Sequence, residues 1–207
     1  MDQRRTDTRA QLQSVALELF AQRGYDSTSL REIADRLGIT KAAVYYHFRT
    51  KDEILASLIE DFLAQLDDLV RWGKTQPHNA ATRIEALRRY GDMLSGHAAE
   101  LARFLREGRS PIRDLDLGIR IRDRYLELFD LLSPPGEPVE GRLRARVALS
   151  SLHIGTTPDS QDIGTETQRR AAALTIATQA LTPSRHSRQS ARTTMPSGTG
   201  GSTHTPS

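Results

Sequence analysis

The sequence of 207 residues contains no cysteine. A disulfide framework, a thiolate metal site and a cysteine nucleophile are therefore excluded. No segment approaches the roughly 20 consecutive apolar residues that span a bilayer. The first ten residues, MDQRRTDTRA, also lack the apolar stretch of a signal peptide. These absences predict a cytoplasmic protein with no membrane partner.

Alternation of apolar and polar residues, the pattern of a half-buried β-strand, is also missing. Apolar residues instead recur three and four positions apart, as on one face of an α-helix. The first such segment carries Leu12, Val15, Ala16, Leu19 and Phe20. Further helices are predicted at about 51–72, 80–95, 97–108, 114–132, 142–154 and 166–181. The predicted fold class is all-α.

Recognisable catalytic and metal-binding patterns are absent as well. The six histidines, at positions 47, 78, 97, 153, 186 and 204, form no HExxH pair. His97 and Glu100 lie three apart on a predicted helix and could share a metal, but such a pair is far more often a surface pair. We predict no enzyme activity, no cofactor and no metal, and an enzyme stays the less favoured alternative.

Charge is unevenly distributed along the chain. Residues 1–51 carry nine Lys/Arg against six Asp/Glu, and residues 183–207 carry three Arg and no acidic residue. Because the whole chain has a net charge of +3, the stretch between them is net negative. This distribution indicates a polyanion bound at the front of the chain. Residues 183–207 have almost no apolar side chains and are predicted to be a disordered tail.

Residues 30–48 have the spacing of two helices joined by a tight turn. Gly38 can take the left-handed conformation that ends the first helix. Ala34 is small enough for the second helix to cross closely, and Thr40 can cap that helix. The wedge between the two helices is formed by Ile33, Ile39 and Val44. A helix-turn-helix is therefore predicted.

The second of these helices carries crowded aromatic residues. At 100° per residue, Val44, His47 and Phe48 fall on the inner side, whereas Ala42, Tyr45, Tyr46 and Arg49 fall on the outer side. Tyrosine hydroxyls can donate to phosphates, and their rings can pack on sugars or a thymine methyl group. The outer side thus favours contact with DNA.

Several of these residues also have a structural interpretation. Tyr45 and Tyr46 could be half-buried packing residues, and His47 could mainly pack inside the domain. Thr28 and Ser29 cap a helix first and reach phosphate only if the geometry allows. Lys51 could be an ordinary solvated charge or could meet a phosphate with the backbone N–H groups of the next helix.

Residues 16–55, ALELFAQRGYDSTSLREIADRLGITKAAVYYHFRTKDEIL, resemble the N-terminal DNA-binding domain of the tetracycline-repressor (TetR) family. The matching features are the Phe20, Gly24 and Tyr25 helix end, the Thr-Ser pair before LREIA, the LGI turn and VYYHFRTKDEIL. The resemblance implies a homodimeric repressor that binds a palindromic operator in double-stranded DNA through the helix at 40–48. It places the following residues at DNA: Thr28, Ser29, Arg31, Thr40, Lys41, Ala42, Tyr45, Tyr46, His47 and Lys51.

The resemblance also implies the organisation of the rest of the chain. We expect a helix-turn-helix domain at 1–50, a helical ligand-binding and dimerisation domain at 51–182, and the tail at 183–207. The expected dimer interface uses helices 142–154 and 166–181. The first offers Leu143, Val147, Leu149, Leu152 and Ile154, and the second offers Leu174, Ala177 and Leu181.

A small-molecule inducer of unidentified chemistry is expected to enter the C-terminal domain and release the operator. Its candidate pocket residues are Leu87, Tyr90, Leu94, Leu101, Phe104, Leu105, Leu117, Ile121, Tyr125 and Phe129. Each of these could equally fill the core. The alternative function is a DNA-binding regulator without an inducer, constitutive or controlled by a partner protein.

Overall fold

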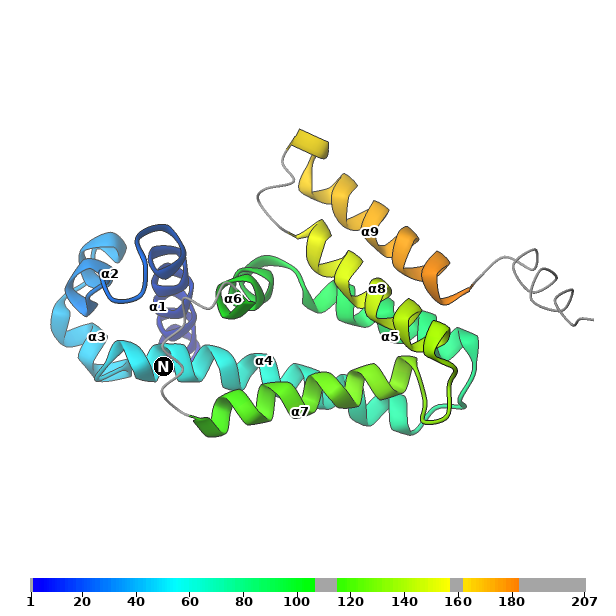
Figure 1. Ribbon diagram of the computed structural model, residues 1–207. Helices are drawn as coiled ribbons and strands as arrows, with labels where there is room; N and C mark the ends of the chain where they lie inside the picture. The colour runs from blue at the N-terminus through cyan, green and yellow to red at the C-terminus, as the bar shows by residue number, and fades with distance from the viewer. Residues whose placement is uncertain (1, 107–114, 157–161, 183–207) are drawn as a thin grey trace, which may run out of the picture.

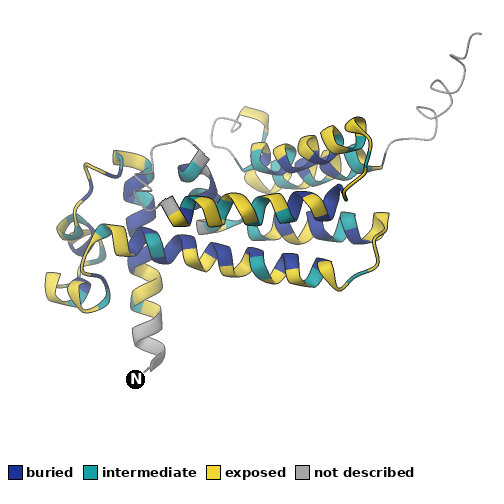
Figure 2. Cartoon of the chain, turned by 60° about the horizontal axis from the view of Figure 1, so that its bottom comes forward, coloured by how far each residue is buried: buried dark blue, intermediate teal, exposed yellow. Residues whose placement is uncertain are grey.

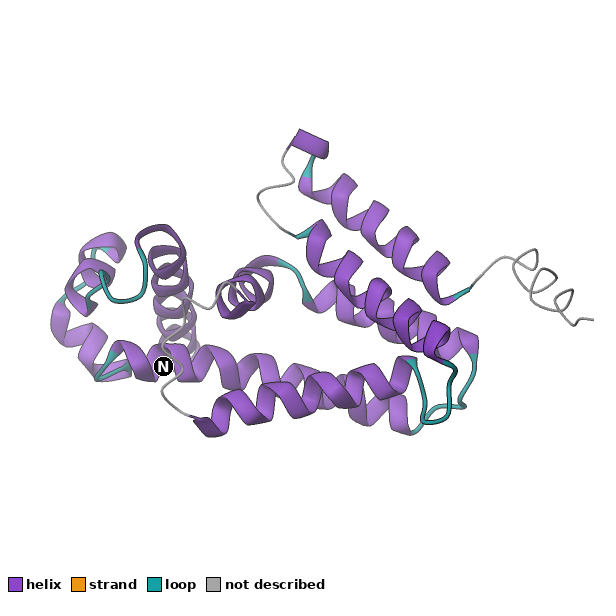
Figure 3. Cartoon of the chain, in the orientation of Figure 1, coloured by secondary structure: helices purple, strands orange, loops and turns teal. Residues whose placement is uncertain are grey.

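The computed structural model describes residues 2–106, 115–156 and 162–182, and within these ranges the chain is helical with no strand (Figure 3). The helices are α1 (Asp2–Arg23), α2 (Leu30–Leu37), α3 (Lys41–His47), α4 (Lys51–Lys74), α5 (Ala80–Met93), α6 (Gly96–Arg106), α7 (Leu115–Leu132), α8 (Val139–Gly155) and α9 (Glu166–Leu181). The all-α prediction is confirmed. The tail predicted at 183–207 lies outside the described residues.

One helix begins earlier than its pattern predicts. The apolar pattern indicates a helix from 142, whereas α8 begins at Val139. Pro138, with φ of −56°, stands immediately before it. Proline is favoured at a helix start because its φ is already near the helical value and its missing N–H has no partner there. The intervening residues Glu140 and Gly141 carry no apolar signal, so periodicity alone does not reveal this turn.

Helices α1, α2 and α3 form a small unit, here called the head, at one end of the molecule (Figure 1). Gly38 ends α2 with φ of +66°, and the N–H of Ile39 donates to the carbonyl of Ala34 at 3.1 Å. This left-handed cap turns the chain so that α3 crosses α2. In the predicted wedge, Ile33 and Val44 are fully buried, and Ile39 is partly buried against the same core.

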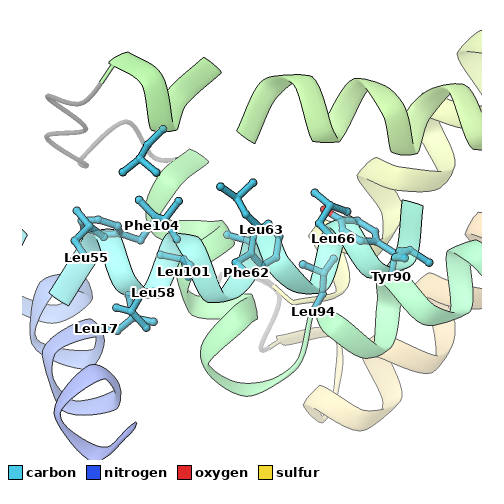
Figure 4. Close-up of a cluster of buried hydrophobic side chains, with 14 of the residues drawn as sticks. Leu17, Leu55, Leu58, Phe62, Leu63, Leu66, Tyr90, Leu94, Leu101 and Phe104 are labelled. Atoms are coloured by element: carbon cyan, nitrogen blue, oxygen red, sulfur yellow. The ribbon is translucent and has the colours of Figure 1, made fainter. Parts of the chain in front are cut away.

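Helix α4 belongs to both the head and the remaining helices, here called the body. Its buried stripe begins at Ile54 and ends at Gly73. In the close-up, Leu55 and Leu58 of this stripe lie near Leu17 of α1, and Leu66 lies farther along, near Tyr90 of α5 (Figure 4). The same apolar cluster therefore continues from the head into the body without a break.

The body packs α5, α7, α8 and α9 beyond the head, with α4 and α7 side by side and α8 beside α9 (Figure 1). Buried residues face the space between the helices, while exposed residues follow their outer sides (Figure 2). Two close crossings fix this arrangement. A Cβ on Gly73 would overlap the side chain of Leu131 on α7, and one on Gly155 would lie 2.6 Å from the Cβ of Ala173 on α9.

Ion pairs follow the edge where α4 meets α7. Arg120 pairs with Glu60, Arg124 with Asp67, and Lys74 with Glu127. The side chains are partly exposed, so each pair contributes only about 0–1 kcal/mol. Their order shows that the two helices run parallel, because the residue numbers of the partners increase together along α4 and α7. Across the described helices, none combines the length and apolar character needed to cross a membrane.

Replacing Gly155 with alanine is expected to loosen the contact between α8 and α9. The new methyl group meets Ala173 at 2.6 Å and the carbonyl oxygen of Arg169 at 3.2 Å, and neither is a flexible side-chain end. We expect Gly155→Ala to lower the free energy of unfolding by about 1–2 kcal/mol, measured by urea denaturation followed by circular dichroism. Gly118→Ala on α7 is the matched control, since its Cβ meets nothing within 4 Å. That variant should gain up to about 1 kcal/mol from helix propensity. Equal stability of the two variants would contradict the close crossing.

Candidate nucleic-acid interface

The outer face of α3 carries two exposed tyrosines. Tyr45 is 45% exposed and Tyr46 is 70% exposed, which is unusual for side chains of this size in a short, well-anchored helix. Lys41, Ala42 and Arg49 are exposed with them. The ammonium of Lys41 lies 5.3 Å from the ring centroid of Tyr45. The structure thus gathers basic and aromatic groups on one exposed face, as the helical wheel predicts.

The opposite face anchors α3. Val44 is fully buried and Phe48 is 2% exposed, so both belong to the apolar core. Thr40 caps the helix, because its hydroxyl accepts from the N–H of Ala43 at 3.2 Å. The guanidinium of Arg9 lies 4.8 Å above the ring of Phe48 and ties the start of α1 to the end of α3. The tyrosines are therefore presented on a fixed support.

His47 takes an intermediate position. It is partly buried, and its ring meets the ring of Tyr46 edge-on at a centroid distance of 5.2 Å. The sequence predicts His47 on the inner side, and the structure places it between the inner and the exposed face. A contact with DNA by His47 stays a prediction, while its contact with Tyr46 shows that it helps to orient that ring.

The start of α2 lies in the same head. Ser29 forms a capping box with Glu32: its hydroxyl accepts from the N–H of Glu32 at 3.2 Å, and its own N–H donates to Glu32 Oε2 at 2.8 Å. The hydrogen bonds from the Ser29 hydroxyl and backbone, together with nearby Arg23, hold the pKa of the Glu32 carboxyl below its usual value. Ser29 and Arg31 are exposed, so both can approach a phosphate.

Thr28 and Lys51 have structural roles other than those the sequence indicates, and the capping role expected of Thr28 is wrong because Ser29 alone caps α2. Thr28 is 3% exposed, and its hydroxyl donates to the carbonyl of Gly24 at 2.9 Å. The ammonium of Lys51 donates to the carbonyls of Tyr25, Asp26 and Thr28 at 2.6, 3.2 and 3.2 Å.

These contacts fasten the loop between α1 and α2 to the start of α4. The three donors of the Lys51 ammonium all have acceptors, so a phosphate would have to replace one of them. The ammonium also lies 4.4 Å from the ring centroid of Tyr25, whose hydroxyl donates to Asp52. DNA contacts by Thr28 and Lys51 stay predictions.

The ten residues proposed for an inducer pocket all belong to the core cluster or pack against it. Leu105, Ile121 and Tyr125 are partly buried, and the other seven are buried. A cavity of about 230 Å³ lies elsewhere, between α5, α8 and α9, with Arg88, Leu152 and Arg170 in its wall. The described residues therefore favour the core interpretation for the ten side chains, and their contact with a ligand stays a prediction.

A polar pair is set into this core. The hydroxyl of Tyr90 lies 3.2 Å from Nε2 of His153, and the ring of Tyr125 lies 6.4 Å from the same imidazole. Tyr90 is 2% exposed, whereas His153 is partly buried. Among the described residues, no group of three or more side chains is placed to hold a metal ion.

Comparison with known proteins identifies the head. Residues 12–58 match the family described as "Bacterial regulatory proteins, tetR family". The chain is 44% identical over 54 residues to the HTH-type transcriptional regulator AcrR of Shigella flexneri, which covers 26% of this chain and 25% of that protein. The resemblance predicted from residues 16–55 is confirmed by these matches. The chain aligns with only about a quarter to a third of the length of the curated relatives it matches.

Solved structures match a larger part of the chain. A member of the TetR transcriptional regulator family from Streptomyces coelicolor A3 has a TM-score of 0.60 at 23% identity, over 84% of this chain and 90% of that one. AibR, solved in complex with isovaleryl coenzyme A and operator DNA, has a TM-score of 0.57 at 18% identity, over 80% of this chain and 95% of that one. At these identities the likeness concerns the fold: a helix-turn-helix head followed by a helical body.

The structural role of Lys51 can be tested by measuring the free energy of unfolding. Lys51→Met keeps the aliphatic stem but removes the donors to three carbonyls, so we expect the free energy of unfolding to fall by about 1–2 kcal/mol. Lys41→Met is the matched control on the exposed face and should change stability by about 0.5 kcal/mol or less. Urea denaturation of both variants measures the difference. If Lys51→Met is as stable as Lys41→Met, the three carbonyl contacts do not fasten the loop.

Proposed function

We propose that the chain is a transcriptional regulator that binds double-stranded operator DNA through α3. The premise is that residues 12–58 form a DNA-binding domain of the tetR family. One observation carries the proposal. Tyr45 and Tyr46 are exposed on the outer face of a helix whose inner face is fixed by Val44 and Phe48. Two adjacent exposed tyrosine rings are poorly solvated by water, whereas a DNA groove uses both the rings and the hydroxyls.

The roles of the side chains follow from their chemistry. The hydroxyls of Tyr45 and Tyr46 donate to phosphate oxygens, and Lys41 near the start of α3 reaches a phosphate or a base edge. Ala42 leaves room for the helix to approach the floor of the major groove. Ser29 and Arg31, at the start of α2, contact the phosphates on one side of the groove. The head thereby supplies phosphate contacts, which position it on the DNA, and base contacts, which recognise the sequence.

A homodimer is the second part of the proposal. The outer side of α8 carries Leu143, Val147 and Ile154, which are 57%, 52% and 58% exposed, at offsets of four and seven residues. Ile176 is 52% exposed on α9, the helix that packs against α8. An exposed stripe of this size supports a self-complementary contact with a second copy. Two heads related by a two-fold axis then read a palindromic operator.

Only part of the predicted interface belongs to this outer surface. Leu149, Leu152 and Ala177 are buried within the chain itself, and Leu174 and Leu181 pack against its core. The proposed interface therefore uses the α8 residues on the outer stripe together with Ile176, a residue that periodicity within α9 does not single out.

The proposed mode of action is repression released by a small organic molecule. The pair of Tyr90 and His153, with the ring of Tyr125 beside it, offers polar groups within an apolar body, as an inducer site requires. AibR, a protein of similar fold, was solved with isovaleryl coenzyme A and operator DNA together. The proposal includes a cytoplasmic location and no enzyme activity or cofactor.

The alternative is a regulator of the same DNA-binding type without an inducer. Calorimetry with a panel of metabolites, performed with and without operator, distinguishes the two. An inducer binds the free protein more tightly than the operator-bound protein by the same factor as it weakens DNA binding.

The DNA-binding surface can be tested on a duplex selected from random sequences by the purified protein. The logarithm of its affinity should fall linearly with the logarithm of salt concentration. Lys41→Met should weaken binding and reduce the magnitude of this slope by about two per dimer, one for each subunit. Arg71→Met, at the far end of α4, is the control and should leave both unchanged.

The tyrosines are tested on the same duplex. Tyr46→Ala should weaken binding by about tenfold or more and Tyr46→Phe by less, because the ring contacts remain when only the hydroxyl is lost. Wild-type affinity in Tyr46→Ala and Lys41→Met together, measured by fluorescence anisotropy, would remove the basis of the proposed function.

The proposed dimer contact through the outer stripe of α8, formed by Leu143, Val147 and Ile154, can be tested by changing one of its residues. Val147→Glu places a charge in the proposed interface, so sedimentation should show a folded monomer with unchanged helical content. Ala64→Glu is the control, because it adds the same charge at an exposed position of α4, away from the outer stripe, and it should sediment as the wild type does. A Val147→Glu protein that also sediments as the wild type would exclude α8 from the contact.

A further inference from the structure

A cavity of about 170 Å³ lies where the head meets the body. Its wall comes from three helices: Ala10, Gln13 and Ser14 of α1, Leu58, Asp61, Phe62 and Gln65 of α4, and Ala98 and Leu101 of α6. The close-up shows Leu58, Phe62 and Leu101 grouped at this junction (Figure 4). Anything seated in this cavity therefore touches the head and the body at once.

Three large apolar side chains of the wall are buried, whereas two of its polar side chains reach solvent. Leu58, Phe62 and Leu101 are 8%, 6% and 2% exposed, and Asp61 and Gln65 are exposed. A ligand that fits such a cavity has a small apolar group for the floor and a polar end for the rim. The volume corresponds to a single ring with a short side chain.

The polar residues of the wall are already ordered. Nε2 of Gln13 donates to Ser57 Oγ at 3.0 Å and to Asp61 Oδ2 at 2.8 Å. Gln13 is 8% exposed and Ser57 is 8% exposed, so this is a buried polar connection between α1 and α4. The Asp61 carboxylate is held in place by Gln13 and keeps its other oxygen, Oδ1, for a further donor.

The charge at the rim selects a cation. Within the part of the chain that the structure describes, Asp61 receives the hydrogen bond from Gln13 and has no ion pair. This distinguishes it from Glu60 and Asp67 on the same helix, which pair with Arg120 and Arg124. None of the other residues in the cavity wall carries a charge. Among the residues that line the cavity, an ammonium group at the rim would meet one carboxylate and no cationic side chain.

We propose that the cavity between α1, α4 and α6 binds a small organic ammonium ion that carries an apolar group, with Asp61 as its counter-ion. The apolar group lies on Leu58, Phe62 and Leu101, and the ammonium lies against Asp61. Because α1 forms one wall, the bound ligand restrains the head relative to the body. This site is separate from the Tyr90 and His153 pair, and its existence does not depend on DNA binding.

Phenethylammonium chloride is a suitable probe, since it combines one ring with one ammonium group. Calorimetry should show saturable binding of one probe per chain. Asp61→Asn should weaken binding by about fivefold or more. Asparagine can still accept the hydrogen bond from Gln13, so this variant retains the buried connection while losing the charge. The uncharged analogue 2-phenylethanol should bind wild type more weakly by a similar factor.

Two further variants separate the cavity from general electrostatics. Asp68→Asn removes an exposed carboxylate of α4 that is paired with Arg71, and it should bind the probe as wild type does. Ala10→Met places bulk at the cavity from an exposed helix position, and it should weaken binding without loss of helical content. Hydrogen exchange should report slower exchange of α1 amides when the probe is bound.

The proposal is overturned if wild type does not bind the probe saturably. It is overturned equally if Asp61→Asn and Asp68→Asn bind alike, or if Ala10→Met binds as wild type does. None of these results involves DNA, so they leave the proposed regulator function untouched. Conversely, a protein that fails to bind any duplex could still show the expected probe binding.

Discussion

The structure depends on a single helix that serves two packing units. Helix α4 buries Ile54 and Leu58 towards the head and Leu66 and Val70 towards the body, so one apolar stripe fixes both. Without this shared stripe the head would consist of α1 and two short helices, too small to bury a core of their own. The body likewise uses the close approach of Gly73 to Leu131 at the other end of α4. Head and body are therefore parts of one core.

Polar contacts determine the position of the head on that core more finely than apolar packing does. The Lys51 ammonium holds three carbonyls of the loop before α2, and Gln13 joins α1 to Ser57 and Asp61 of α4. Apolar contacts tolerate small shifts because they are not directional. Hydrogen bonds at 2.6–3.2 Å are directional and lose their strength when the geometry changes. The orientation of α3 is thus set by a few polar side chains at the head–body junction.

The features that could be predicted from the sequence are local ones. Gly38, Thr40 and the inward placement of Val44 each follow from geometry within a few residues, so the turn and the exposed face of α3 were predictable. The pairs Gln13–Asp61 and Tyr90–His153 are 48 and 63 residues apart, and no local pattern indicates them. The same limit explains Lys51, whose acceptors are backbone carbonyls that any sequence provides. The sequence could not separate candidate pocket residues from core residues, because a large apolar side chain has the same pattern in a core as in a binding site.

The connection between α3 and α4 consists of only Phe48, Arg49 and Thr50, and Phe48 is buried. This short connection leaves α3 little freedom of its own, so it follows α4 in any rotation. A helix of 24 residues is about 36 Å long, and a tilt of about 5° about one end moves the other by about 3 Å. Angular changes too small to disturb the packing of the body are thereby converted into displacements comparable to the length of a hydrogen bond.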